Sequence, residues 1–258
     1  MTVKINVGGV WKSVTNLCPK VGGLYKQVVG VFVKVGGVWR STAQSIIGQW
    51  ALTDVGYAQS IDVDTAGNVY VAYFSLSGTT TSVRKLNSAG VQVWALADVG
   101  NANGIAVDTS GNVYVAYGNS DGTINVRKLN SAGVQVWSST DIGNAQSIAV
   151  DTSGNVYVTG NYNMVRKFNS SGVQVWSATD VVYAQGVAVG TSGNVYVAYK
   201  NSDGTTTIRK LNSSGVQVWA LADVIRANDI AVDTSGNVYV AYQNSAGTIN
   251  VRKLNPIW

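Results

Sequence analysis

The chain has 258 residues, of which 46% are hydrophobic and only 12% are charged, and its formal net charge is +5. It contains no His and no Glu, so its thirteen acidic residues are all Asp, and this excludes Ser-His-Asp and Cys-His catalytic sites as well as imidazole metal ligands. We therefore expect no enzymatic activity, no bound metal and no cofactor. The single Cys18 excludes an intrachain disulfide.

Residues 1–45 contain a short repeat built around Gly-Gly pairs. The pairs lie at positions 8–9, 22–23 and 36–37, which gives a period of 14 residues. Gly-Gly between two alternating apolar runs is typical of a two-residue β-hairpin, so the segment predicts three hairpins. Isolated hairpins are marginally stable, and we expect this module to dock on the rest of the chain, on copies of itself or on a larger assembly.

The basic residues are concentrated at the N-terminus. The first 53 residues hold six bases and no acid, but these are spaced singly among apolar residues, which favours a solvated face over a nucleic-acid patch. The start of the chain has no apolar run of signal-peptide length, and no segment has the length of a membrane span. We expect a protein made in the cytoplasm and not exported by the ordinary route, with no nucleic-acid partner and no membrane insertion.

Residues 46–258 consist of five longer repeats. The motif "GNVY" begins at five positions that are separated by 44, 43, 39 and 43 residues. Each unit has four short strand-like runs, and the turns "DTSGN" and "NSAG" join the first to the second and the third to the fourth. Four antiparallel strands per unit, repeated radially, are typical of a β-propeller. The sequence therefore predicts an all-β fold with a five-bladed β-propeller of four-stranded antiparallel blades.

The last unit lacks its fourth strand. The run "VQVW" follows the third strand in four units, whereas the chain ends in "NPIW". The segment "IIGQW" at residues 46–50 precedes the first unit and has Trp at the matching position. We predict that residues 46–50 pair with the last third strand, around residues 251–254, and that this velcro closure completes the ring.

The units, such as "GIAVDTSGNVYVAY" followed by "VRKLNSAGVQVW", resemble the bacterial β-propeller repeats of the SBBP and NHL type across residues 46–258. This resemblance implies the propeller fold and says little about function. Those families usually build six or seven blades, and the chain resembles tachylectin-like lectins in blade number only. Separately, "VKVGGVWR" and "INVGGVWKSV" resemble short modules of phage tail and other virion proteins, which implies an anchoring or oligomerisation role for residues 1–45 and a location in the virion.

Residues that recur in every unit are expected to be structural. One carboxylate per "DTxGN" turn is too few for a calcium loop, so these Asp residues are predicted to cap their turns. The Asp residues before the first strands are predicted to contact third-strand Arg or backbone groups. The Trp residues that end the outer strands are predicted to pack between blades rather than to stack on sugars. The turn acids are Asp64, Asp108, Asp151 and Asp233, and the acids before the first strands are Asp54, Asp98, Asp141, Asp180 and Asp223.

The loops expected on one face of the propeller vary, whereas the turns expected on the other face are nearly identical. A binding face on a repeated scaffold has this pattern, and so do loops under no selection; both interpretations stay open. An amide in every blade offers paired donors and acceptors to sugar hydroxyls. Asp62 and Asp229, each found in one blade only, are either special or simply solvated. The candidate ligand-binding residues are Tyr57, Gln59, Asn101, Asn103, Asn144, Gln146, Tyr183, Gln185, Arg226 and Asn228.

These features predict a non-enzymatic structural or adhesive protein of a phage tail or virion surface. Its propeller is expected to present a binding face to host-surface glycans. Its N-terminal module is expected to bind other virion proteins or further copies of the chain, which allows a homo-oligomer. The alternative is a soluble multivalent lectin with one sugar site per blade and affinity gained through avidity.

Overall fold

The structure is a computed structural model. It describes residue 50 and the N-terminal strands, and residues 57–254 except 75–80, 98–100, 119–123, 140–144, 161–163, 180, 182, 202–205, 225 and 244–247. Contacts divide the chain into two units, Met1–Ala51 and Leu52–Trp258, and the sequence-based boundary lies between residues 45 and 46. In the described part of the chain there is no helix with the length and apolar character needed to cross a membrane.

The first unit contains three antiparallel β-hairpins. In each of them the two paired strands are separated by one Gly-Gly pair, with partners such as Val7 and Val10 closing the ladder. The three hairpins predicted from the 14-residue period are therefore confirmed. The strands are β1 (Val3–Val7), β2 (Val10–Val14), β3 (Lys20–Val21), β4 (Leu24–Tyr25), β5 (Phe32–Val35) and β6 (Val38–Ser41).

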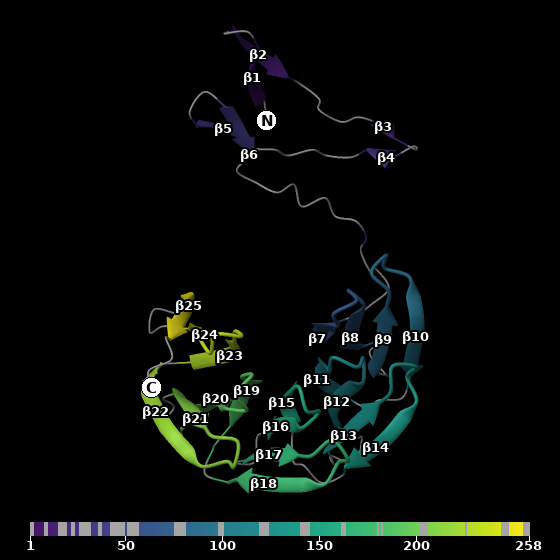
Figure 1. The fold of residues 1–258 in the computed structure, drawn as a ribbon, viewed down its shortest axis with the longest axis vertical. Coiled ribbons are helices and arrows are strands. Elements are labelled where there is room, and N and C mark those ends of the chain that lie inside the picture. Colours follow the sequence, from purple (N-terminus) through teal and green to yellow (C-terminus); the bar gives the residue numbers. More distant parts are fainter. Residues whose placement is uncertain are drawn as a thin grey trace. The chain divides into compact units, whose positions relative to one another are not determined.

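The second unit is a propeller of five antiparallel sheets, numbered here as blades 1 to 5. The sheets follow one another around a central axis, with each first strand innermost and each fourth strand outermost (Figure 1). The predicted five-bladed all-β propeller is confirmed. Blade 1 comprises β7 (Ala58–Val63), β8 (Val69–Phe74), β9 (Thr81–Leu86) and β10 (Gln92–Ala97); blade 2 comprises β11 (Asn101–Val107), β12 (Val113–Gly118), β13 (Ile124–Leu129) and β14 (Gln135–Ser139). Blade 3 comprises β15 (Ala145–Val150), β16 (Val156–Gly160), β17 (Met164–Phe168) and β18 (Gln174–Ala178). Blade 4 comprises β19 (Ala184–Val189), β20 (Val195–Lys200), β21 (Thr206–Leu211) and β22 (Gln217–Val224), and blade 5 comprises β23 (Arg226–Val232), β24 (Val238–Gln243) and β25 (Ile249–Leu254).

Blade 5 has three strands among the described residues. Its predicted fourth strand, residues 46–50, lies outside them except for Trp50, which is exposed. Each inner strand packs on the next from β7 to β23, and no comparable packing joins β23 back to β7 in the described part of the chain. The velcro closure therefore stays a prediction.

The hydrophobic core lies between neighbouring blades. Buried side chains of blade 1, such as Tyr70 and Val83, form one cluster with Ile105 and Val113 of blade 2. Equivalent clusters join blade 2 to 3, 3 to 4 and 4 to 5. Strands such as β12, buried along their whole length, need the apolar runs on both faces that the repeats supply.

The "DTxGN" turns are capped by their Asp side chains, as predicted. Asp108 Oδ1 accepts hydrogen bonds from the backbone N–H groups of Ser110 and Asn112, both at 2.9 Å, and Oδ2 accepts from Asn112 Nδ2 at 2.8 Å and from the Tyr114 hydroxyl at 2.9 Å. Burial acts to raise the pKa of Asp108, but these hydrogen bonds outweigh it and hold the pKa below its usual value. The same network is made by Asp64, Asp151 and Asp233.

The fourth-strand Trp residues of blades 1 to 4 pack between neighbouring blades, as predicted. Trp137 lies against Tyr114 of its own blade with ring centroids 6.2 Å apart, and its Nε1 donates to the Ser170 carbonyl of blade 3 at 3.0 Å. Gly172 in the same blade 3 turn has φ +83°, and an added Cβ there would lie 2.7 Å from the Trp137 ring, so only Gly fits. Trp94 and Trp176 make the equivalent contacts.

The third-strand Arg residues pack on Tyr of the second strand. Arg127 Cζ lies 5.0 Å from the Tyr117 ring centroid, and Nη2 donates to the Tyr117 hydroxyl at 3.2 Å. Arg84 and Arg209 do the same with their Tyr partners. The side chains of the five Asp residues that were predicted to contact these Arg residues lie outside the described residues, so that contact stays a prediction.

Candidate functional site

The predicted amides converge on one hollow at the variable-loop end of the inner strands. Its volume is 260 Å³. Each of the first four blades supplies one amide side chain, and blade 5 supplies the carboxylate of Asp229. The small residues that follow the amides, Ser60 and Ser147 among them, line it as well. The amides that line it are Gln59, Asn103, Gln146 and Gln185.

A β-bulge places each of these amides. In all five blades the register between the first and second strands shifts by one residue just after the invariant Ala of the loop. In blade 3, for example, Ala145 pairs with Gly160 and Ser147 with Thr159, which leaves Gln146 as the extra residue. A bulge redirects the side chain of its extra residue, and here it does so at the amide position of every blade.

The four amides differ in what they bond. Asn103 Nδ2 donates to the Ala145 carbonyl at 2.8 Å and so links blade 2 to blade 3. The side-chain amides of Gln59, Gln146 and Gln185 form no hydrogen bond among the described residues. These three amides are therefore available to a ligand, whereas the amide of Asn103 also holds the scaffold together.

The structure describes the other predicted ligand-binding residues only in part. Tyr57 is exposed. Tyr183 is exposed as well, and with φ 44° it is the one non-glycine residue of the described chain in the left-handed region. Asn144 lies outside the described residues, and so do the side chains of Asn101, Arg226 and Asn228, whose backbones lie in β11 and β23.

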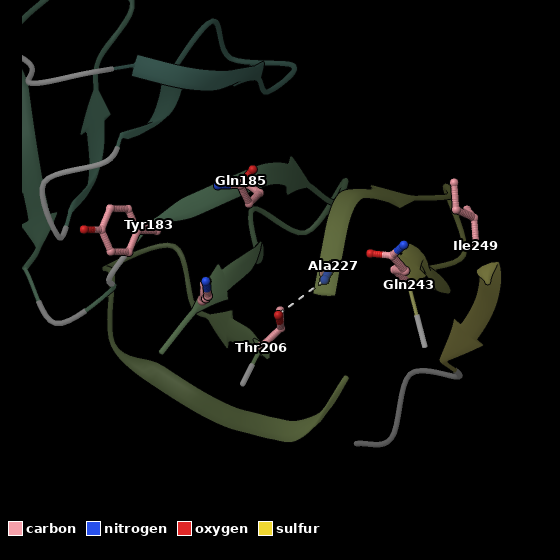
Figure 2. Close-up of a pocket in the computed structure, with 7 residues that line it drawn as sticks. Tyr183, Gln185, Thr206, Ala227, Gln243 and Ile249 are labelled. Atoms are coloured by element: carbon pink, nitrogen blue, oxygen red, sulfur yellow. Dashed lines mark hydrogen bonds between the residues drawn. The ribbon is translucent and has the colours of Figure 1, made fainter. Parts of the chain in front are cut away.

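A second hollow of 570 Å³ lies beside the first, between blades 4 and 5. Gln185 lines both hollows, so they adjoin. Figure 2 shows Tyr183 and Gln185 on one side, Gln243 and Ile249 on the other, and Thr206 and Ala227 between them. Lys200 completes the lining.

Three residues at the strand ends of this second hollow were not among the predicted site residues: Lys200, Thr206 and Gln243. A signal was present, because the last residue of the second strand differs in every blade except for two Gly. Those residues are Phe74, Gly118, Gly160, Lys200 and Gln243.

The two single-blade acids lie in different hollows. Asp62 lines a third hollow of 430 Å³, formed by apolar residues of the inner strands, where its Oδ2 accepts from Val107 N at 2.7 Å and its Oδ1 from Val63 N at 2.8 Å. Burial raises the pKa of Asp62, and these two backbone bonds partly offset the rise. Asp62 thus links blade 1 to blade 2, and Asp229 lines the amide hollow instead.

In the described part of the chain, no three His, Cys, Asp or Glu residues gather as a metal site would require.

Comparison with known proteins agrees with this architecture. Residues 138–161, which run from β14 to just beyond β16, match the SBBP family, described as a beta-propeller repeat. The chain is a β-propeller repeat protein. A crystal structure of a protein of unknown function from Bacteroides caccae is similar to it, with a TM-score of 0.58, 15% identity and coverage of 77% of each chain, and at this identity the likeness shows the fold alone. No curated protein matches the sequence.

Proposed function

We propose that this β-propeller repeat protein is a non-enzymatic adhesive or structural component of a phage particle, and that its variable face binds glycans on the host surface. The observation that carries the binding role is the convergence of bulged amides from four blades on one hollow. Primary amides offer both donors and acceptors, which is what neighbouring sugar hydroxyls require. The exposed rings of Tyr57 and Tyr183 add apolar faces on the same side of the propeller.

The non-enzymatic part of the proposal rests on the side-chain inventory. The chain has no His and no Glu, so an acid/base pair for glycoside hydrolysis would need two Asp residues at one site. Asp62 and Asp229, the two single-blade acids of the inner strands, line different hollows. The other Asp residues whose side chains the structure describes, Asp64, Asp108, Asp151 and Asp233, cap turns in a repeated way.

The phage assignment rests on the N-terminal module. Its three hairpins repeat every 14 residues, resemble short modules of phage tail proteins, and carry six bases and no acid within the first 53 residues. Short hairpins need a partner surface to be stable, which supports anchoring on other virion proteins or on further copies of the chain. Detection of the protein by mass spectrometry in purified phage particles tests this part, and its absence from them would contradict it.

The alternative function is a soluble multivalent lectin with one site per blade. The repetition of an amide at the same bulge in each blade favours it. The amides of four blades line one shared hollow, however, and this supports a single central site over several independent ones. Stoichiometry separates the two, because a central site binds one glycan per chain and blade sites bind several.

The binding role is tested on a glycan array with the full chain and the triple variant Gln59→Ala, Gln146→Ala, Gln185→Ala. We expect the variant to keep the wild-type melting temperature, because these amides bond nothing within the described structure. Binding should weaken at least about tenfold, since each lost hydrogen bond contributes about 1 kcal/mol.

The matched control for the array experiment is Ala89→Ser with Ala132→Ser, which converts two "NSAG" turns into the "NSSG" form that other blades already have. This control should bind as the wild type does. Normal binding by the triple variant together with loss of binding in the control would assign the site to the opposite face.

A further inference from the structure

The hollow between blades 4 and 5 differs from the amide hollow in its charge. Among the described residues that line it, Lys200 is the one charged side chain, and its neighbours are uncharged donors and acceptors such as Gln185 and Gln243. The Lys200 ammonium group forms no ion pair and no hydrogen bond with the residues that the structure describes. A half-buried ammonium in a hollow with no acid among its described lining residues attracts an anion.

This cation is specific to one blade. The corresponding strand ends in blades 1, 2, 3 and 5 are Phe, Gly, Gly and Gln, so four blades carry no charge there. In the β23–β24 ladder, moreover, Arg226 pairs with Gln243 at the rim of the same hollow, and it is the one base among the loop positions flanking the invariant Ala. The backbones of both residues therefore lie at the boundary of blades 4 and 5.

Two hydrogen bonds connect the elements that line the hollow. The Lys200 N–H donates to the Tyr183 carbonyl at 3.3 Å, which ties the end of β20 to the residue with the left-handed backbone. Across the hollow, the Ala227 N–H donates to Thr206 Oγ1 at 3.4 Å and joins blade 5 to blade 4 (Figure 2). Non-glycine residues in the left-handed region are costly and gather at ligand sites. The exposed Tyr183 ring, which lines the same hollow as Lys200, offers a surface for a sugar face.

We propose that the hollow lined by Tyr183, Gln185 and Lys200 selects glycans that carry an anionic group, with the sugar ring at the amide hollow and its carboxylate or sulfate at Lys200. This inference rests on the proposed glycan binding and adds the class of glycan. Because Gln185 lines both hollows, one substituted sugar reaches both the amides and the ammonium.

The test compares glycans that share a core and differ by one anionic group. The probes are N-acetyllactosamine with and without a terminal sialic acid, and galactose with and without a 6-sulfate, immobilised at equal density. The full chain should bind the anionic member of at least one pair about tenfold more tightly, as a charge-assisted hydrogen bond supplies. The sialylated and sulfated probes tell a carboxylate from a sulfate.

Two substitutions of Lys200 and one control isolate its role. Lys200→Gln should lose the tenfold preference and keep the binding of the neutral core, whereas Lys200→Arg should keep the preference. Lys253→Gln removes the same charge from β25. Lys253 lies near the end of β25 opposite to Ile249, the residue of that strand that lines the hollow, so this variant should leave the preference unchanged. An equal loss of preference in Lys200→Gln and Lys253→Gln would mean attraction by net charge alone and would overturn the proposal.

The remaining outcomes separate this inference from the proposed function. Equal binding of neutral and anionic glycans by the wild type would overturn the anionic selectivity and leave glycan binding in place. Binding of no glycan at all would contradict the proposed function, and with it this inference. The last outcome concerns nucleic acid. If poly(U) displaced the bound anionic glycan at a lower concentration than free sialic acid or sulfated galactose did, the hollow would be assigned to a nucleic acid. That result would overturn the proposal.

Discussion

Blade 2 and blade 5 contain the same third strand, "INVRKL", in two very different surroundings. In blade 2 the strand β13 buries Val126 completely, at 0% exposure, whereas in blade 5 the strand β25 leaves Val251 72% exposed. At the other end of the propeller Ile61 of β7 is 65% exposed, and its counterpart Ile105 in β11 is 5% exposed. The burial of a strand here depends on its neighbours and not on its own sequence.

The turns of the same blades do not differ. Asp233 in blade 5 accepts the same four hydrogen bonds as Asp108 in blade 2, from two backbone N–H groups, an Asn amide and a Tyr hydroxyl. These contacts are made within six residues of sequence, so a missing neighbour leaves them intact. The difference between central and end blades is therefore confined to packing between strands and between blades.

The largest expected effect concerns the uncovered edge of blade 5. If residues 46–50 cover β25 as predicted, deleting residues 1–50 removes that strand together with Trp50, whereas deleting residues 1–44 keeps it. We expect the longer deletion to lower the free energy of unfolding by about 3 kcal/mol or more relative to the shorter one, which is the usual cost of losing a packed Trp. Thermal melts of the two truncated proteins measure it, and equal melting temperatures would contradict the closure.

A substitution in β25 tests the same predicted closure by residues 46–50. Val251→Ala should destabilise the chain that begins at residue 45 by about 2 kcal/mol, as expected for a Val that the added strand buries. In the chain that begins at residue 51 the same change should cost less than about 0.5 kcal/mol, because Val251 is then on the surface. Urea unfolding of the four proteins gives both values. The same small cost in both backgrounds would mean that residues 46–50 do not lie on β25.

Turn capping should give a smaller effect that is the same in central and end blades. Asp108→Ala removes a local network and should lower the melting temperature by about 2–4 °C, equivalent to about 1 kcal/mol, and Asp233→Ala should lower it as well. Blade 4 allows the reverse substitution, because Gly190 stands in its turn where the other blades have Asp. Gly190 has no positive φ, and an added Cβ would lie 3.7 Å from Tyr196 and from Val232, which are ordinary contact distances. Gly190→Asp should therefore raise the melting temperature, and a decrease would show that the network cannot be transferred between blades.

The smallest expected effect is that of pH near neutrality. Hydrogen bonds lower the pKa of Asp64, Asp108 and Asp233, although burial opposes the shift at all three. A lowered folded-state pKa contributes stability that is present above the unfolded value, near 4, and is lost as the pH falls through the folded value. The raised pKa of Asp62 acts in the opposite sense and offsets part of this loss.

With no His in the chain, we expect a constant melting temperature from about pH 6 to 8. The melting temperature should decline below about pH 4, and blades 2 and 5 should respond alike because their turns are alike. Melts across the pH series measure this. A cooperative loss of structure between pH 6 and 8 would contradict it.

Much of the fold follows from short-range patterns in the sequence. The Gly-Gly pairs predict the three hairpins, the "GNVY" spacing predicts five blades, and the "DTxGN" motif predicts the Asp caps. The hairpins and the caps involve residues within a few positions of one another, and the number of blades follows from counting one recurring motif. The Trp residues were predicted to pack between blades because they recur in every unit, although their partner, the Ser carbonyl of the next blade, is visible only in the structure.

The sequence by itself determined the strands, their turns and the presence of one amide per blade. Only the tertiary structure decided that these amides are bulged residues, that four of them share one hollow, and that Lys200 lies beside it. Where a bulge forms depends on how far the first strand must bend to follow the inner ring, and which strand ends meet depends on how neighbouring blades pack. Both depend on contacts between residues about forty positions apart or more, where a repeated local pattern carries no information about its surroundings.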